Sequence, residues 1–348
     1  MKKITAALLC VMLVISTSVT AFGATKNDVK EKIDTAVAFA FDGNYSKNGY
    51  TVSDSKNLYI LARSGADISG FTQAYFSCVA DAAANGTLTD PGTIGMAVSI
   101  AEAAGLDPEN INGLDLAGAL EAAAQNAVSS PYNYFYAVEA AVSLGLEDTV
   151  TVLCDALANY YIPGTGTDFW SGYGTSPDDL SMFILAMNTA GKYSELTADA
   201  FELLETYYTE EGYTNYGANV DSTALALAAY CSDGNAQKAD EIYDILIQNY
   251  YDSETGGFKA DYDEYYATAD AVFALSFYLP LADDPAPQES TTVVNNEATA
   301  STTESTTAQQ NKDAEKASPK TGVQTVPAIC AAACALMLGA VAVKKKNK

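Results

Sequence analysis

The strongest constraint on the fold is an alternation of two kinds of helix-forming segment. One kind is amphipathic: in 236–250, the apolar residues Ala239, Ile242 and Leu246 recur at spacings of three and four. The other kind is apolar on nearly all sides, as in 224–230, and a helix of that kind must be buried. A chain that alternates the two can place its apolar helices inside a ring of amphipathic ones.

The alternation predicts an all-α repeat domain. Amphipathic helices are predicted at 27–41, 71–84, 114–127, 147–160, 196–208 and 236–250. Apolar helices are predicted at 58–62, 91–104, 131–144, 177–187, 221–230 and 267–275. Six hairpins over residues 25–281 favour an (α/α)6 toroid, in which the amphipathic helices surround the apolar ones. An open right-handed helical solenoid is the competing architecture.

The loops that open the apolar helices carry a family resemblance. Thr255-Gly256-Gly257-Phe258 precedes one such helix, and Asp221-Ser222-Thr223-Ala224 begins another. This pattern resembles the prenyltransferase and squalene-oxidase repeat, which implies a toroid like those of terpene cyclases and protein prenyltransferase β subunits. The likeness covers roughly 58–279 and is specific only across 169–279.

The first 24 residues are typical of a secretory signal peptide. Lys2 and Lys3 precede an apolar run at 4–14, and Ala21-Phe22-Gly23 supplies small residues for cleavage. We therefore expect the chain to be exported.

The last residues predict attachment to a Gram-positive cell wall. Residues 326–343 form an apolar stretch without charge that is long enough to cross a bilayer, and a lysine cluster follows it. Upstream lies Ser318-Pro319-Lys320-Thr321-Gly322, and this order resembles a sortase sorting signal of the class B type. The resemblance implies that a sortase attacks the Thr321 carbonyl and links the chain to peptidoglycan. Residues 326–343 would then span the membrane only until this reaction. Residues 282–317 are rich in Ser and Thr, and we expect a disordered stalk there.

Composition excludes several functions. The chain has no His, which removes the zinc site of a protein prenyltransferase as well as Ser-His-Asp and Cys-His catalysis. Its 44 acidic residues against 18 basic ones repel nucleic acid. Cys78, Cys154 and Cys231 are isolated from one another and read as buried apolar residues. We therefore expect no cofactor and no metal site.

Three acids at the starts of the apolar helices are candidate site residues. We expect Asp178, Asp179 and Asp221 to cap helix N-termini, with ligand contact and acid catalysis as open alternatives. Asp221 corresponds to the central acid of a terpene cyclase, but its neighbours in Asn219-Val220-Asp221-Ser222 are not carboxylates. Its pKa is therefore expected near the ordinary value, which makes it a weak general acid.

Aromatic residues in the same loops predict a ligand-binding rim, if they do not instead pack between the hairpins. The side chains expected on this rim, besides the three acids, are Trp170, Tyr173, Tyr216, Tyr262, Tyr265 and Tyr266. Tyrosine and tryptophan offer an apolar face and a polar tip, which suits sugars, peptides and small molecules such as corrinoids. The sequence thus favours a non-catalytic ligand-binding or adhesion module for an unknown extracellular ligand. A terpene-cyclase-like enzyme that uses Asp221 is the alternative.

Overall fold

The prediction of an all-helical domain is confirmed. The structure is a computed structural model that describes residues 23–41, 50–126, 131–169, 174–214 and 216–284, all within one compact unit. These residues form twelve α-helices, labelled α2 to α13, with two short 3-10 turns and two very short hairpins between them. None of the described helices has the length and apolar character that a membrane span requires.

The helices fall into the two predicted kinds. The more exposed ones are α2 (Lys26–Phe41), α4 (Ser69–Ala84), α6 (Leu116–Ala124), α8 (Glu147–Ala158), α10 (Ser194–Glu205) and α12 (Ala236–Tyr250). The more buried ones are α3 (Ser55–Ser64), α5 (Pro91–Ala103), α7 (Tyr134–Ser143), α9 (Pro177–Ala190), α11 (Val220–Ser232) and α13 (Glu264–Tyr278). In α11 every residue from Ser222 to Cys231 is buried, whereas α12 buries only Ala239, Ile242, Tyr243 and Leu246.

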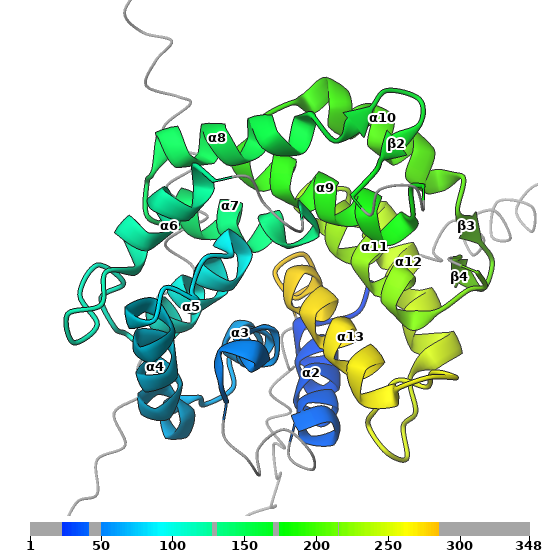
Figure 1. Cartoon of the computed structure of the whole chain (residues 1–348). Coiled ribbons are helices and arrows are strands. Elements are labelled where there is room, and N and C mark those ends of the chain that lie inside the picture. Colours follow the sequence, from blue (N-terminus) through cyan, green and yellow to red (C-terminus); the bar gives the residue numbers. More distant parts are fainter. Residues whose placement is uncertain (1–22, 42–49, 127–130, 170–173, 215, 285–348) are drawn as a thin grey trace, which may run out of the picture. The chain divides into compact units, whose positions relative to one another are not determined.

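The buried helices contact one another in chain order. α3 packs on α5, α5 on α7, α7 on α9, α9 on α11 and α11 on α13, and α13 in turn packs on α3 (Figure 1). Each of α5, α7, α9 and α11 also packs against the exposed helix that follows it in the chain. The succession of buried helices therefore closes on itself.

The first helix completes the last hairpin. α2 packs on α13, although the two lie at opposite ends of the described chain (Figure 1). Next to this contact, the backbone N–H of Lys26 donates to the Asp283 carbonyl at 2.8 Å, and the Lys26 ammonium pairs with Asp284 at 2.6 Å. Ala282 is buried as well. The packed domain thus extends to Asp284, three residues past the predicted end of the repeat domain at 281.

Aromatic side chains fill the space enclosed by the buried helices. Tyr59 of α3 meets Tyr136 of α7 edge-on, with ring centroids 5.0 Å apart, and Phe135 of α7 meets Phe273 of α13 at 5.9 Å. All four are at most 2% exposed. Because α3, α7 and α13 are not all neighbours in the succession, these rings cross its interior and hold its opposite sides together.

The loops between exposed and buried helices are built in a repeated way. One hairpin pairs β1 (Tyr161–Ile162) with β2 (Gly166–Thr167), and another pairs β3 (Tyr208–Thr209) with β4 (Gly212–Tyr213). The Tyr213 N–H donates to the Thr223 hydroxyl at 3.0 Å, and the Phe258 N–H donates to Thr268 at 2.8 Å. Gly212 has φ +124°, and a Cβ there would lie 2.4 Å from the Thr223 hydroxyl. Glycine at this position therefore allows the loop to approach the helix.

Candidate functional site

A cavity lies where the loops before α11 and α13 meet the start of α9. Its volume is about 830 Å³, within the usual range for small-molecule sites. Its charged and aromatic lining residues are Asp178, Tyr216, Asp221, Tyr250, Lys259, Asp261, Tyr262 and Glu264. We call it the acidic–tyrosine cavity. Four predicted site residues therefore lie in one place: Asp178, Tyr216, Asp221 and Tyr262.

The expectation that the three acids cap helices is wrong. The N-cap of α9 is Ser176, whose hydroxyl accepts from the Asp179 N–H at 3.1 Å, and the N-cap of α11 is Asn219, which accepts from the Ser222 N–H at 2.9 Å. Ser and Asn are better placed because the capping side chain must precede the first helical residue. Asp178 and Asp221 are each the second residue of their helix, so their carboxylates are left for other contacts.

Asp221 is the acid most strongly changed by its surroundings. The Tyr262 hydroxyl donates to Asp221 Oδ2 at 2.6 Å, while Oδ1 is buried without a hydrogen-bond partner. Burial, and next the charge of Asp270, raise the pKa of Asp221 to about 7, against the opposing effect of the Tyr262 hydrogen bond. Asp178 adds to the rise. The expected ordinary pKa is therefore wrong, because the fold buries Asp221 and also brings like charges to it from neighbouring helices instead of from its own segment.

Asp270 and Lys56 belong to the same region and were missed. Asp270, the seventh residue of α13, is 2% exposed, and Lys56 of α3 pairs with it at 2.7 Å. The Lys56 ammonium also donates to the Tyr266 hydroxyl at 3.2 Å. Burial lowers the pKa of Lys56, but Asp270, Tyr136 and Tyr266 together outweigh it, and the pKa is raised well above the ordinary value. A single acid within an otherwise apolar helix was the available signal for Asp270.

The predicted aromatic rim is only partly present. Tyr216 is fully exposed, Tyr262 is 55% exposed beside the cavity, and Tyr266 lies over Lys56 with the ammonium 4.6 Å from the ring centroid. Tyr265 instead stacks on Phe39 of α2, with ring centroids 5.1 Å apart. Tyr265 therefore packs against α2. This agrees with the alternative interpretation, in which the loop aromatic residues pack between hairpins instead of forming a rim. Trp170 and Tyr173 lie outside the described residues.

Asp179 is buried away from this cavity. It is 1% exposed and does not line the cavity, whereas the adjacent Asp178 does. Burial and the charge of Asp179 raise the pKa of Tyr207, which places Asp179 on the side of the hairpin formed by β3 and β4. Consecutive helix residues point about 100° apart, so only one of the pair can face the cavity.

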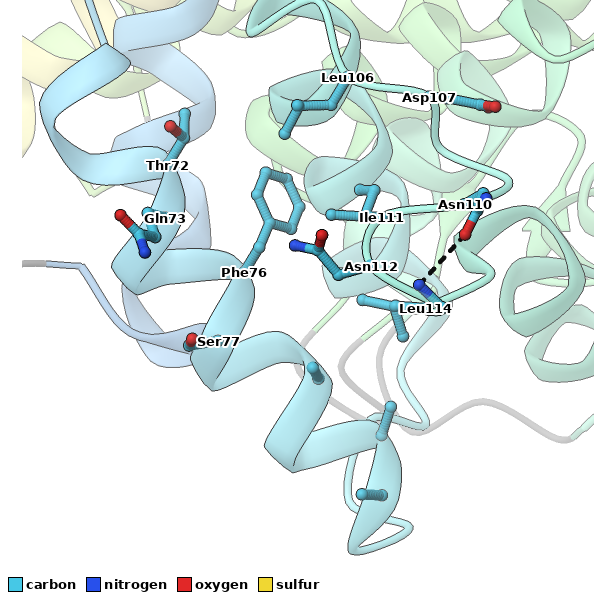
Figure 2. A pocket seen from close by; sticks show the side chains of 14 residues that line it. Thr72, Gln73, Phe76, Ser77, Leu106, Asp107, Asn110, Ile111, Asn112 and Leu114 are labelled. Atoms are coloured by element: carbon cyan, nitrogen blue, oxygen red, sulfur yellow. Dashed lines mark hydrogen bonds between the residues drawn. The ribbon is translucent and has the colours of Figure 1, made fainter.

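A second cavity, of about 710 Å³, lies between α4 and the loop that joins α5 to α6. Figure 2 shows Phe76 of α4 opposite Leu106 and Ile111 of the loop, and the amide of Asn110 holding the turn by accepting from the Gly113 N–H at 3.1 Å. Its lining is uncharged except for Asp107. It lacks the buried ionisable groups that mark the acidic–tyrosine cavity, so we place the candidate site at the latter.

The acidic–tyrosine cavity presents carboxylates, which accept hydrogen bonds, and tyrosine hydroxyls, which can also donate them. Within the described ranges, no three His, Cys, Asp or Glu side chains are grouped so that they could hold a metal ion. Cys78, Cys154 and Cys231 are free thiols. Burial raises the pKa of Cys154 to about 11, so that thiol is protonated and unreactive at neutral pH. The chemistry of the site therefore comes from its carboxylates and tyrosines.

No model of a known protein family matches the chain, and no curated protein matches it by sequence.

Proposed function

We propose that the protein is a non-catalytic ligand-binding module displayed at the outside of the cell, with its ligand in the acidic–tyrosine cavity. One observation carries the proposal: Asp221 lines this cavity beside Tyr262, which donates to it at 2.6 Å, and burial and next the charge of Asp270 raise the pKa of its carboxyl to about 7.

The architecture of this module is an (α/α)6 toroid. The closed succession of α3, α5, α7, α9, α11 and α13 supports it, as does the packing of α2 on α13. A ring whose last hairpin is completed by its first helix has no exposed end faces to protect. Such a domain holds its interhelix loops rigidly, which suits a site built from three of them.

The display of the module rests on segments outside the described residues. A signal peptide at 1–24 exports the chain, and a sortase joins Thr321 of Ser318-Pro319-Lys320-Thr321-Gly322 to peptidoglycan. Residues 285–317 form the stalk, and 326–343 hold the chain in the membrane before sorting. Thr321→Ala should move the protein from the wall fraction to the membrane or the medium; an unchanged wall fraction would refute sorting by this motif.

The binding function is tested by ligand-dependent melting of the purified protein. Glycans, corrinoids, matrix peptides, amines and squalene-type polyenes are screened, because a ligand at 100 times its Kd adds about 2.7 kcal/mol to the free energy of unfolding. The same screen on Asp221→Asn locates the site, and Asp81→Asn, an exposed acid on α4, is the matched control. If no compound shifts the wild type selectively over Asp221→Asn, the proposed site is wrong.

A terpene-cyclase-like enzyme is the second candidate, favoured by the raised pKa of Asp221. A carboxyl with a pKa of about 7 is protonated in part at neutral pH and can act as a general acid. Against it, the rings of Tyr59, Phe135, Tyr136 and Phe273 fill the interior in which a polyene would have to fold. Turnover of a polyene that Asp221→Asn abolishes would decide for the enzyme.

A further inference from the structure

The two ends of the described chain meet beside α13, and Ala24 is part of that junction. The Ala24 carbonyl accepts from the Asp283 N–H at 3.1 Å, and the Lys26 N–H donates to the Asp283 carbonyl at 2.8 Å. Ala24 also packs against the hydrophobic core. The predicted signal peptide ends at residue 24, but a chain that keeps these contacts has to begin at Ala24 or before it.

The backbone nitrogen of Ala24 lies beside a buried hydroxyl and a carboxylate. Its N–H donates to the hydroxyl of Tyr278, which is fully buried and itself donates to Asp240 Oδ1 at 2.5 Å. Asp240 also lies against the preceding residue, since a Cβ on Gly23 would be 3.2 Å from Oδ2 and 3.3 Å from Oδ1. The peptide bond between Gly23 and Ala24 is therefore next to the carboxylate of Asp240.

The residues before this bond suit a signal peptidase. Ala21 and Gly23 occupy the third and the first position before it, where the peptidase requires small side chains. A cut after Gly23 leaves every contact of Ala24 in place and turns its amide nitrogen into an amine. The space that Gly23 occupies beside Asp240 is then open to that amine.

The surroundings of Ala24 favour a positive charge. Besides Asp240 and Tyr278, the titratable side chains of the elements that meet here are those of Cys231, Tyr243, Asp244, Lys26, Asp28, Asp283 and Asp284. Lys26 is the one cation in this set, and it pairs with Asp284 at 2.6 Å. Asp28 accepts from the N–H of Thr25 at 3.2 Å and from its hydroxyl at 2.7 Å. This carboxylate offsets the positive end of α2, which would otherwise oppose an ammonium group.

From these contacts, we propose that the exported chain is cut between Gly23 and Ala24, and that the new α-ammonium group of Ala24 binds Tyr278 and Asp240. Water adds across the peptide bond, so that Gly23 leaves as the carboxylate end of the signal peptide and Ala24 keeps the ammonium. The ammonium donates to the Tyr278 hydroxyl, as the amide did, and gains an ion pair with Asp240. Processing thereby strengthens the junction at which α2 packs on α13. The inference rests on the proposed export of the chain and is independent of the ligand.

The first test is the N-terminal sequence of the protein collected from the wall and the medium of cells that express the full chain. We expect Ala24 as the first residue. A first residue of Phe22 or Thr25 would overturn the proposal, because the amine would then not be at the nitrogen that faces Tyr278.

The second test is the titration of the α-amine in that mature protein, followed by NMR after reductive methylation with labelled formaldehyde. An ordinary α-amine has a pKa of about 7.7–8.0, and we expect this one to titrate about 0.5 to 1 pH unit higher. The ion pair should therefore stabilise the protein below about pH 7.7, and this contribution is lost as the pH rises through the raised pKa.

Variants separate the ion pair from the general charge of an acidic protein. Asp240→Asn should return the titration to the ordinary range, and folding is not at risk because the amide oxygen can still accept from Tyr278. Asp81→Asn, an exposed acid on α4, should leave the raised titration unchanged. An ordinary titration in the wild type, or the same titration in the wild type and Asp240→Asn, would overturn the proposal.

Failure of the inference differs from failure of the proposed function. A mature chain that begins at another residue between 20 and 30 refutes this junction and leaves export through a signal peptide standing. A chain that is found outside the cell with Lys2 and Lys3 still attached, or that is not found there at all, refutes the cleaved signal peptide as well.

Discussion

Two polar clusters lie inside the succession of buried helices, and they differ in how completely their groups are paired. The arginine cluster, near the C-terminal ends of these helices, consists of Tyr59, Arg63, Glu139 and Ser276. Arg63 forms an ion pair with Glu139 and donates to Ser276 at 2.9 Å, and the Tyr59 hydroxyl donates to Glu139 at 2.6 Å. The carboxylate cluster, near the N-terminal ends, consists of Lys56, Asp221 and Asp270.

The carboxylate cluster has two acids, Asp221 and Asp270, for one cation. Lys56 pairs with Asp270, and Asp221 keeps a buried oxygen without a donor. A cluster with every group paired adds rigidity, whereas one with a surplus of like charge lowers stability unless something binds there. The comparison teaches that polar groups inside the same helices can differ in role: the arginine cluster holds α3, α7 and α13 together, whereas in the carboxylate cluster Asp221 is buried beside the like charge of Asp270.

The largest effect is expected from breaking the arginine cluster. Arg63→Met leaves Glu139 half-buried without its cation and should lower the free energy of unfolding by about 3 kcal/mol. Urea denaturation followed by circular dichroism measures it. Arg63→Met with Glu139→Gln should recover most of the loss, since no uncompensated charge is left. If Arg63→Met alone is as stable as the wild type, this cluster does not hold the helices together.

A smaller change in the free energy of unfolding, a gain instead of a loss, is expected from a substitution in the carboxylate cluster. The pKa of Asp221 is raised from 3.8 to about 7, so the folded protein holds this proton more tightly than the unfolded chain. The stability from this group is fully present below about pH 4 and is lost as the pH rises through about 7. Relative to the wild type, Asp221→Asn should therefore gain about 2 kcal/mol between these pH values, after allowance for solvent screening.

Unfolding of both proteins in urea at a series of pH values measures this gain. Asp81→Asn should show no comparable pH-dependent difference from the wild type, because Asp81 is exposed on α4. The difference in the free energy of unfolding between Asp221→Asn and the wild type could instead stay constant with pH. That result would contradict the raised pKa of Asp221 on which the comparison rests.

The smallest effect is expected from the one hydrogen bond that relieves Asp221. Tyr262→Phe removes the donor to Asp221 Oδ2 and should lower the free energy of unfolding by about 1 kcal/mol. Because that bond lowers the pKa of Asp221, its removal should also move the carboxyl titration to higher pH, which NMR of the labelled carboxyl carbon follows. Tyr208→Phe, whose hydroxyl donates to Glu241, is the control and should leave the Asp221 titration in place.

Most of the helices could be predicted because their signal is local. Helix α12 spans the predicted 236–250, and α5 begins at the predicted Pro91, since periodicity at three and four residues decides which face is buried. The short hairpins of β1 to β4 were not predicted, because two-residue strands carry no periodicity. The predicted caps are wrong: Ser176 and Asn219 cap these helices, two residues before Asp178 and Asp221.

The sequence alone therefore determined which segments are helices, which of them are buried, and that acids and tyrosines open several of them. The tertiary structure alone decided the chemistry of these acids. Asp221 and Asp270 lie on different helices, and Lys56 comes from α3 near the other end of the chain, so only packing brings their charges together. The physical reason is that helix formation depends on neighbours in the chain, whereas the pKa of a buried carboxyl depends on neighbours in space.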